Sequence, residues 1–132
     1  MAYAENSLCL CIFLVLSVPC AAETIKLTCL QELIGGNGRK TESAIEWDDS
    51  QRDVIFVNGT RIPRTIAGAE TTLRLGDALV TWCVRDLDDV GYMSCYEIDR
   101  TSGILEEIEF EARKRNVISR GTCRKRSEGK KF

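Results

Sequence analysis

The chain has no histidine among its 132 residues, so it lacks the side chain that most often serves in catalysis at neutral pH. Imidazole is the usual general base, the commonest metal ligand and the group that activates serine and cysteine nucleophiles. Chemistry of these three kinds is excluded wherever it depends on histidine. We therefore predict no catalytic residue, no metal ligand and no cofactor, and we expect a protein that is not an enzyme.

The chain also lacks an apolar run long enough to cross a bilayer. The apolar run within residues 8–20 (LCLCIFLVLSVPC) is about 12 residues long, whereas a spanning helix needs about 20. Ala21-Ala22 follow it and favour cleavage after Ala22, although the preceding segment holds Glu5 and no Lys or Arg. We interpret residues 1–22 as a signal peptide and expect an exported protein, periplasmic or secreted. Acylation of Cys20 and an uncleaved anchor are the alternatives.

Clusters with the spacing of a known metal or catalytic site are missing too. The carboxylates gather in two turn-like segments and one strand-like segment. They are Asp48, Asp49 and Asp53, then Asp86, Asp88 and Asp89, and finally Glu106, Glu107, Glu109 and Glu111. Neither aspartate group has the spacing of a calcium loop. We interpret the aspartates as turn residues and the glutamates as the solvated face of a strand or helix.

Four cysteines remain after the predicted cleavage, and they form the framework of the mature chain. Cys29, Cys83, Cys95 and Cys123 are separated by 54, 12 and 28 residues, without the close pairs of a zinc site. An even count in a short exported domain predicts two disulfides, for which three connectivities exist. One or two free thiols are the alternative.

Charge is unevenly distributed along the chain. Residues 23–111 carry 9 basic and 18 acidic side chains, whereas residues 112–132 carry 9 basic and 1 acidic. The basic residues of the C-terminal part are Arg113, Lys114, Arg115, Arg120, Arg124, Lys125, Arg126, Lys130 and Lys131. We expect a solvated basic tail over residues 124–132. The alternative is that the basic residues contact an anionic partner such as lipid or polysaccharide, with nucleic acid disfavoured by export.

Short β-rich segments separated by turn residues run through residues 23–123. Strands are predicted at 24–33, 43–47, 53–59, 71–75, 78–86, 92–99, 104–112 and 116–123. Pro63 cannot donate to a sheet ladder, so its segment belongs to an edge or a crossing. The pattern predicts an all-β fold, a small antiparallel meander of seven to eight strands forming a curved sheet or barrel. Residues 104–115 would also suit a helix, but their alternation favours a strand.

One register of the hairpin between 78–86 and 92–99 brings two cysteines together. If Cys83 lies opposite Cys95, Trp82 faces Tyr96 and the apolar side chains collect on one side of the sheet. Paired cysteines on adjacent strands then lie at disulfide distance. Cys29 pairs with Cys123 by elimination, which links the first strand to the last.

The segment YEIDRTSGIL (96–105) and the later GTC (121–123) carry a resemblance. Together they resemble the C-terminal part of small exported proteobacterial proteins without assigned functions, and more distantly the compact β-barrels of periplasmic lysozyme inhibitors. The resemblance implies export and a β-rich fold. It transfers no functional residue, because the Ser/Gly-rich loop of those inhibitors is missing here. Hairpin geometry explains the same residues, since Asp99 can cap the turn and Gly103 can adopt positive φ.

These features predict a single disulfide-linked β domain over residues 23–123. We expect a non-enzymatic binding or inhibitory module of the cell envelope or extracellular space, whose partner is an envelope or extracellular protein. A structural or accessory envelope protein, with its basic tail on anionic lipid or polysaccharide, is the main alternative. A carboxylate-dependent hydrolase is the third.

Overall fold

The computed structural model describes residues 23–89 and 91–126, and all regular structure in these ranges is β-strand. There is no helix here, and hence none able to cross a membrane. The predicted signal peptide and residues 127–132, with Lys130 and Lys131, lie outside the described residues. The strands are β1 (Thr24–Leu33), β2 (Lys40–Asp48), β3 (Ile55–Val57), β4 (Thr60–Ile62), β5 (Thr65–Ile66), β6 (Ala69–Leu75), β7 (Leu79–Asp86), β8 (Tyr92–Asp99), β9 (Ile104–Glu111) and β10 (Lys114–Lys125).

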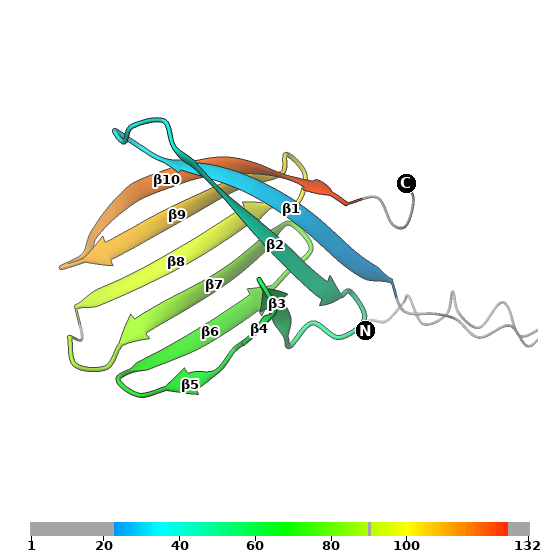
Figure 1. The fold of residues 1–132 in the computed structure, drawn as a ribbon. Coiled ribbons are helices and arrows are strands. Elements are labelled where there is room, and N and C mark those ends of the chain that lie inside the picture. Colours follow the sequence, from blue (N-terminus) through cyan, green and yellow to red (C-terminus); the bar gives the residue numbers. More distant parts are fainter. Residues whose placement is uncertain (1–22, 90, 127–132) are drawn as a thin grey trace, which may run out of the picture.

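These ten strands form one antiparallel sheet that is curled into a half-barrel. Their order is β4-β3-β2-β1-β10-β9-β8-β7-β6-β5, so strands that are neighbours in sequence pair with each other except β4 and β5, and β1 also pairs with β10. In Figure 1, β1 and β2 cross in front of β7 and β8, and the short strands β4 and β5 form the two edges of the sheet, with β3 next to β4. The predicted antiparallel meander is confirmed, and its first and last strands are adjacent.

The expectation of seven to eight strands is wrong, because the segment from Ile55 to Ile66 holds three very short strands. β3, β4 and β5 contain three, three and two residues. Asn58 and Gly59, which lie within the predicted strand 53–59, form the turn between β3 and β4 with φ of 52° and 82°. Pro63 follows β4 at the edge of the sheet, as its missing N–H requires.

The segment after Gly103 is a strand and not a helix, as its alternation predicts. β9 ends at Glu111, and Ala112 and Arg113 reverse the chain with φ of 50° and 72°. β10 then runs back along β9 to Lys125, so Arg124 and Lys125 belong to the last strand of the sheet.

Both predicted disulfides are present, and the predicted hairpin register is confirmed. Cys83 lies opposite Cys95, with an S–S distance of 2.09 Å. Trp82 lies opposite Tyr96, and their rings stack with centroids 5.2 Å apart. The second disulfide joins Cys29 of β1 to Cys123 of β10.

The turn between β8 and β9 has the geometry that its residues predict. The Asp99 side chain accepts hydrogen bonds from the backbone N–H groups of Thr101 (2.8 Å) and Ser102 (3.0 Å). These two bonds are the main reason that the pKa of Asp99 is lowered. Gly103 follows with φ of 78°, and a Cβ there would lie 2.7 Å from the Cys123 carbonyl oxygen.

The hydrophobic core lies on the concave face of the half-barrel. Residues paired on adjacent strands lie on the same face of the sheet. One apolar row therefore runs across the five strands from β10 to β6 and contains Gly121, Leu105, Ile98, Val80 and Leu75. Ile45 and Ile55 pack into the same core and are almost completely buried. Burial of each large aliphatic side chain stabilises the fold by about 1.5–3 kcal/mol.

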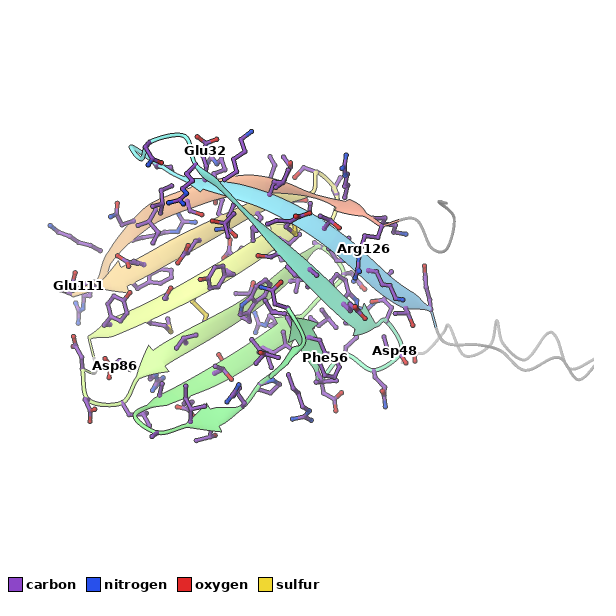
Figure 2. The ribbon with its side chains drawn as sticks, viewed as in Figure 1. Glu32, Asp48, Phe56, Asp86, Glu111 and Arg126 are labelled. Carbon is purple, nitrogen blue, oxygen red and sulfur yellow. A yellow bond between two sulfur atoms is a disulfide. The ribbon has the colours of Figure 1, made fainter. Side chains whose placement is uncertain are left out.

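Ion pairs close the end of the half-barrel below this row, which we call the base. Asp49 pairs with Arg52 and with Arg100, both at 3.2 Å, and Arg52 also pairs with Asp77. The Arg100 guanidinium lies 5.4 Å from the centre of the Trp47 ring. Figure 2 shows Asp48 near the base, with Asp86 and Glu111 at the opposite end. These contacts leave a pocket of about 420 Å³ at the base, lined by Trp47, Asp49 and Arg100 among others, whereas the larger pocket described below lies toward the opposite end.

Candidate functional site

A pocket of about 970 Å³ opens on the concave face, above the apolar core. Its walls come from β1, β2, β3, β4, β7, β8, β9 and β10, and the loop between β1 and β2 forms its rim. Its lining includes Gln31, Glu32, Leu33, Asn37, Arg39, Ile45, Ile62, Trp82, Val84, Tyr96, Leu105, Glu107 and Ser119. Sites for small organic molecules have volumes of about 300–1,000 Å³, mostly apolar walls and a few convergent polar groups.

The sheet register places a mixed row of side chains directly above the apolar row. This second row runs from β1 to β6 through Leu33, Ser119, Glu107, Tyr96, Trp82 and Leu73. The row above it, closer to the opening, contains Glu109, Ser94, Val84 and Thr71. The concave face therefore changes from apolar at the base to polar at the opening.

A tyrosine–glutamate pair lies at the centre of the second row. The Tyr96 hydroxyl donates a hydrogen bond to Oε2 of Glu107, at 3.1 Å. Burial, the negative charge of Glu107 and this hydrogen bond together raise the pKa of Tyr96 to about 12. At neutral pH the Tyr96 hydroxyl is therefore protonated and remains a donor.

The remaining acceptor capacity of Glu107 is directed at the pocket. Within residues 23–89 and 91–126, no group donates to its Oε1 atom and no cationic side chain lies within 4.0 Å of its carboxylate. The side chain is only half-buried, so solvent reaches it through the pocket. Glu106, the preceding residue, lies on the other face and pairs with Arg120.

Ser119 is the buried polar residue of the pocket wall. The Gln31 side-chain amide donates a hydrogen bond to its hydroxyl oxygen, and the Ser119 side chain is almost fully buried. A bulge between Val117 and Ser119 shifts the β10 register, which brings Ser119 opposite Glu107 on the concave face. Without the extra residue, Ile118 would occupy that position.

A second tyrosine–glutamate pair lies closer to the opening. The Tyr92 hydroxyl donates to Oε2 of Glu109 at 2.8 Å, and this hydrogen bond is the main reason that the pKa of Tyr92 is raised. Glu109 is also without an ion pair in the described part of the chain. Acidic groups thus extend from the pocket toward its opening.

The rim loop carries exposed apolar side chains. Leu33 and Ile34 have exposed fractions of 59% and 57%, and the Ile34 N–H donates to the Ile118 carbonyl oxygen. The backbone N–H of Arg39 donates to the Asn37 side chain at 3.0 Å, which closes the loop on itself. An apolar surface therefore borders the entrance.

The basic residues suggested by the sequence do not gather at the pocket. Those with described positions lie in or next to β10: Arg113, Lys114, Arg115, Arg120, Arg124, Lys125 and Arg126. Arg120 pairs with Glu106, Arg115 lies 4.0 Å from the same carboxylate, and Arg126 pairs with Glu46 at 3.1 Å. Arg113, Lys114, Arg124 and Lys125 are exposed and make no ion pair with any described residue.

The aspartate clusters have local structural roles. The Asp86 side chain accepts the N–H of Asp88 at 2.9 Å, and the Asp48 side chain accepts the N–H of Ser50 at the same distance. Burial alone would raise the pKa of Asp49, but hydrogen bonds from Arg100 and Trp47 and the charges of Arg100 and Arg52 lower it. No group of three or more described metal-ligating residues could hold a metal ion.

No protein-family model, curated protein or solved structure matches this chain. The similarities suggested by residues 96–105 and 121–123 therefore remain predictions. The function has to be argued from the chemistry of the concave face.

The sequence interpretation missed Glu107, which it assigned to a solvated face. The alternation of β9 does separate Glu106 from Glu107, but it does not say which of the two faces is concave. The register of β8 with β9 decides this, because it sets Tyr96 opposite Glu107. The available signal was an acidic residue, Glu107, paired with an aromatic residue, Tyr96, on the apolar face of the hairpin of β7 and β8.

Proposed function

We propose that this protein is an exported, non-enzymatic binding module of the cell envelope or extracellular space, and that its ligand enters the concave pocket. The open pocket of about 970 Å³ above a filled core is the observation that carries the proposal. The pocket combines buried aliphatic residues at its lower end with polar side chains above them, and such a combination can bind and orient a ligand. A partner protein's side chain or a free small molecule would fit such a site.

The polar groups of the pocket support binding over catalysis. Ser119 accepts its hydrogen bond from the amide of Gln31, which is not a base, and Tyr96 holds its proton at neutral pH. An adjacent general base is a common way to activate a nucleophile, and the Ser119 hydroxyl is hydrogen-bonded to an amide instead. These contacts support a role in binding.

The two disulfides support export to a periplasm or to the extracellular space. Such bonds persist in oxidising compartments and are rare in a reducing cytosol. The predicted signal peptide at residues 1–22 is consistent with this location.

Pocket binding can be tested with a substitution that fills the site. Val84 faces the pocket, and Thr72 lies exposed on the opposite face of the adjacent strand β6. A small-molecule library is screened by thermal shift on the oxidised protein, and hits are titrated against Val84→Trp and Thr72→Trp. We expect hits that lose affinity at least 10-fold in Val84→Trp and keep it in Thr72→Trp. Hits that bind both variants equally, or no hits at all, would refute the proposal.

A second candidate function is attachment to an anionic surface, for which the exposed basic residues of β10 are the specific observation. Arg113, Lys114, Arg124 and Lys125 have no carboxylate partner among the described residues, which leaves their charge available. Binding to anionic vesicles should weaken steeply between low and high salt, and the Arg124→Gln/Lys125→Gln variant should bind less. Salt-independent vesicle binding, or none, would exclude this function.

A further inference from the structure

We propose that the ligand of the concave pocket carries an ammonium group on an apolar or aromatic body, and that Glu107 is its counter-ion. This inference rests on the proposed binding function and specifies the chemistry of the ligand. Only Glu32, Arg39 and Glu107 are charged among the residues that line the pocket. Glu32 and Arg39 have opposite signs, so Glu107 gives the lining its net negative charge.

Glu107 lacks the ion pair that Asp49 and Glu106 make, and unlike Glu109, which also lacks one, it lines the pocket. Asp49 pairs with two arginines, and Glu106 pairs with Arg120. Glu107 has only the Tyr96 hydroxyl as a partner. A carboxylate that is partly removed from water gains from a cation, and charge-assisted hydrogen bonds are about twice as strong as neutral ones. The missing cation is therefore the group that the ligand would supply.

Tyr96 fixes the position in which such a cation would bind. Its hydroxyl occupies Oε2 of Glu107 and stays protonated, so Oε1 is the acceptor left for an incoming N–H donor. The Tyr96 ring stacks on Trp82 with an interplanar angle of 13°, and both residues line the pocket. The carboxylate and the two rings thus lie next to one another in the pocket wall, so an ammonium group at Oε1 would carry its apolar body against the aromatic pair.

The lower part of the pocket would hold the rest of the ligand. Ile45, Ile62 and Leu105 are buried aliphatic residues that line it. They provide no hydrogen-bond partner, so a polar or doubly charged body would lose its hydration there without compensation. An apolar body of drug-like size fits the volume and this chemistry. A free amine with an apolar body and the lysine side chain of a partner protein both have this chemistry.

Matched ligands test the charge requirement. We compare 2-phenylethylamine with neutral 2-phenylethanol and anionic 3-phenylpropionate, using tryptophan fluorescence and calorimetry on the oxidised protein at pH 7. A short lysine-containing peptide forms the fourth arm and distinguishes a protein-borne ammonium from a free amine. We expect the amine or the peptide to bind at least 10-fold more tightly than the neutral and anionic compounds.

Matched variants test the residue. Glu107→Gln keeps an acceptor for the Tyr96 hydroxyl and removes the charge, and Glu106→Gln makes the same change on the other face of β9. Amine affinity should fall about 10- to 100-fold in Glu107→Gln and stay within about 2-fold in Glu106→Gln. Circular dichroism and thermal unfolding confirm that both variants are folded.

The outcomes separate this inference from the function on which it rests. Equal affinity for amine and alcohol, tighter binding of the anion, or unchanged amine affinity in Glu107→Gln would overturn the inference. The inference would also be overturned if neither ammonium probe bound at concentrations up to about 10 mM. A dissociation constant above that value corresponds to negligible affinity. The binding function would survive each result if library hits of another charge still lost affinity in Val84→Trp.

Discussion

Removal of the Cys29–Cys123 disulfide should destabilise the protein more than removal of Cys83–Cys95, although both join neighbouring antiparallel strands. The two bonds close loops of very different length, with sequence separations of 94 and 12. In the chain-entropy relation, these separations correspond to about 4.7 and about 2.8 kcal/mol at 25 °C. The expected difference of about 1.8 kcal/mol arises in the unfolded chain, because opening the longer loop restores more conformational entropy than opening the shorter one.

Packing around the sulfurs should widen this difference. Cys29 is fully buried in the concave core, and Cys123 packs against that core. Cys95 is almost as buried as Cys29, with exposed fractions of 3% and 0%, but neither Cys83 nor Cys95 belongs to the core cluster. Replacement of Cys29 and Cys123 by alanine therefore removes contacts within the main core, whereas replacement of Cys83 and Cys95 removes contacts outside it.

The comparison needs two double variants, Cys29→Ala/Cys123→Ala and Cys83→Ala/Cys95→Ala. Urea unfolding of the oxidised proteins gives the free energy of unfolding in water, and intact mass confirms that the remaining disulfide is closed. Equal losses for the two variants, or a larger loss for Cys83→Ala/Cys95→Ala, would refute the reasoning from loop length.

Three other predictions follow from single residues. Tyr96 holds its proton to a pKa of about 12 in the folded state, against an ordinary value of 10.0, so stability should fall as pH rises from 10 to 12. Absorbance at 295 nm should detect this late ionisation, and Tyr96→Phe should lack it. The pKa of Asp49 is lowered from 3.8, so its stabilisation is present above that pH and is lost below it. Asp49→Asn should therefore cost about 1 kcal/mol in urea unfolding at pH 7 and less at pH 3. A Cβ on Gly121 would lie 1.8 Å from the Leu30 carbonyl oxygen, so Gly121→Ala should lower stability by about 1–3 kcal/mol or more, whereas exposed Thr122→Ala should change it little.

The pairing of β7 with β8 could be predicted because several constraints agree on one register. Slipping by one residue would separate Cys83 from Cys95 and would also mix the apolar and polar faces. The turn from Asp99 to Gly103 was predictable for a similar reason, since a capping side chain and a positive φ are both needed there.

The number of strands was harder to predict because the segment from Ile55 to Ile66 hides a turn and holds very short strands. Asn58-Gly59 is a strong hairpin signal, but it directly follows the β-rich residues of β3 and was included with them. β5 has only two residues and follows Pro63, so no periodic pattern indicates it. The break between 104–112 and 116–123 was predicted, but Ala112 and Arg113 adopt positive φ there without being glycine or asparagine.

The pocket could not be predicted because polar residues on a strand usually face water. Glu107 and Ser119 face the concave side, where the sheet curls but the core does not fill the space. The pairing of β9 with β10, with its bulge before Ser119, brings them together, and the long-range pairing of β1 with β10 continues the wall to Leu33. Curvature depends on the whole sheet, so a local pattern cannot distinguish an outer surface from the wall of a pocket.

The first and last described residues, Glu23 and Arg126, both lie at the base. The Asp49 N–H donates to the Glu23 carbonyl oxygen, and the Arg126 N–H donates to that of Lys26. An affinity tag, fluorescent reporter or solid support joined directly before Glu23 or directly after Arg126 is therefore attached on the side away from the pocket entrance. Immobilised protein would present its opening to the solution, which suits the molecule to sensor-surface assays without a redesign of its loops.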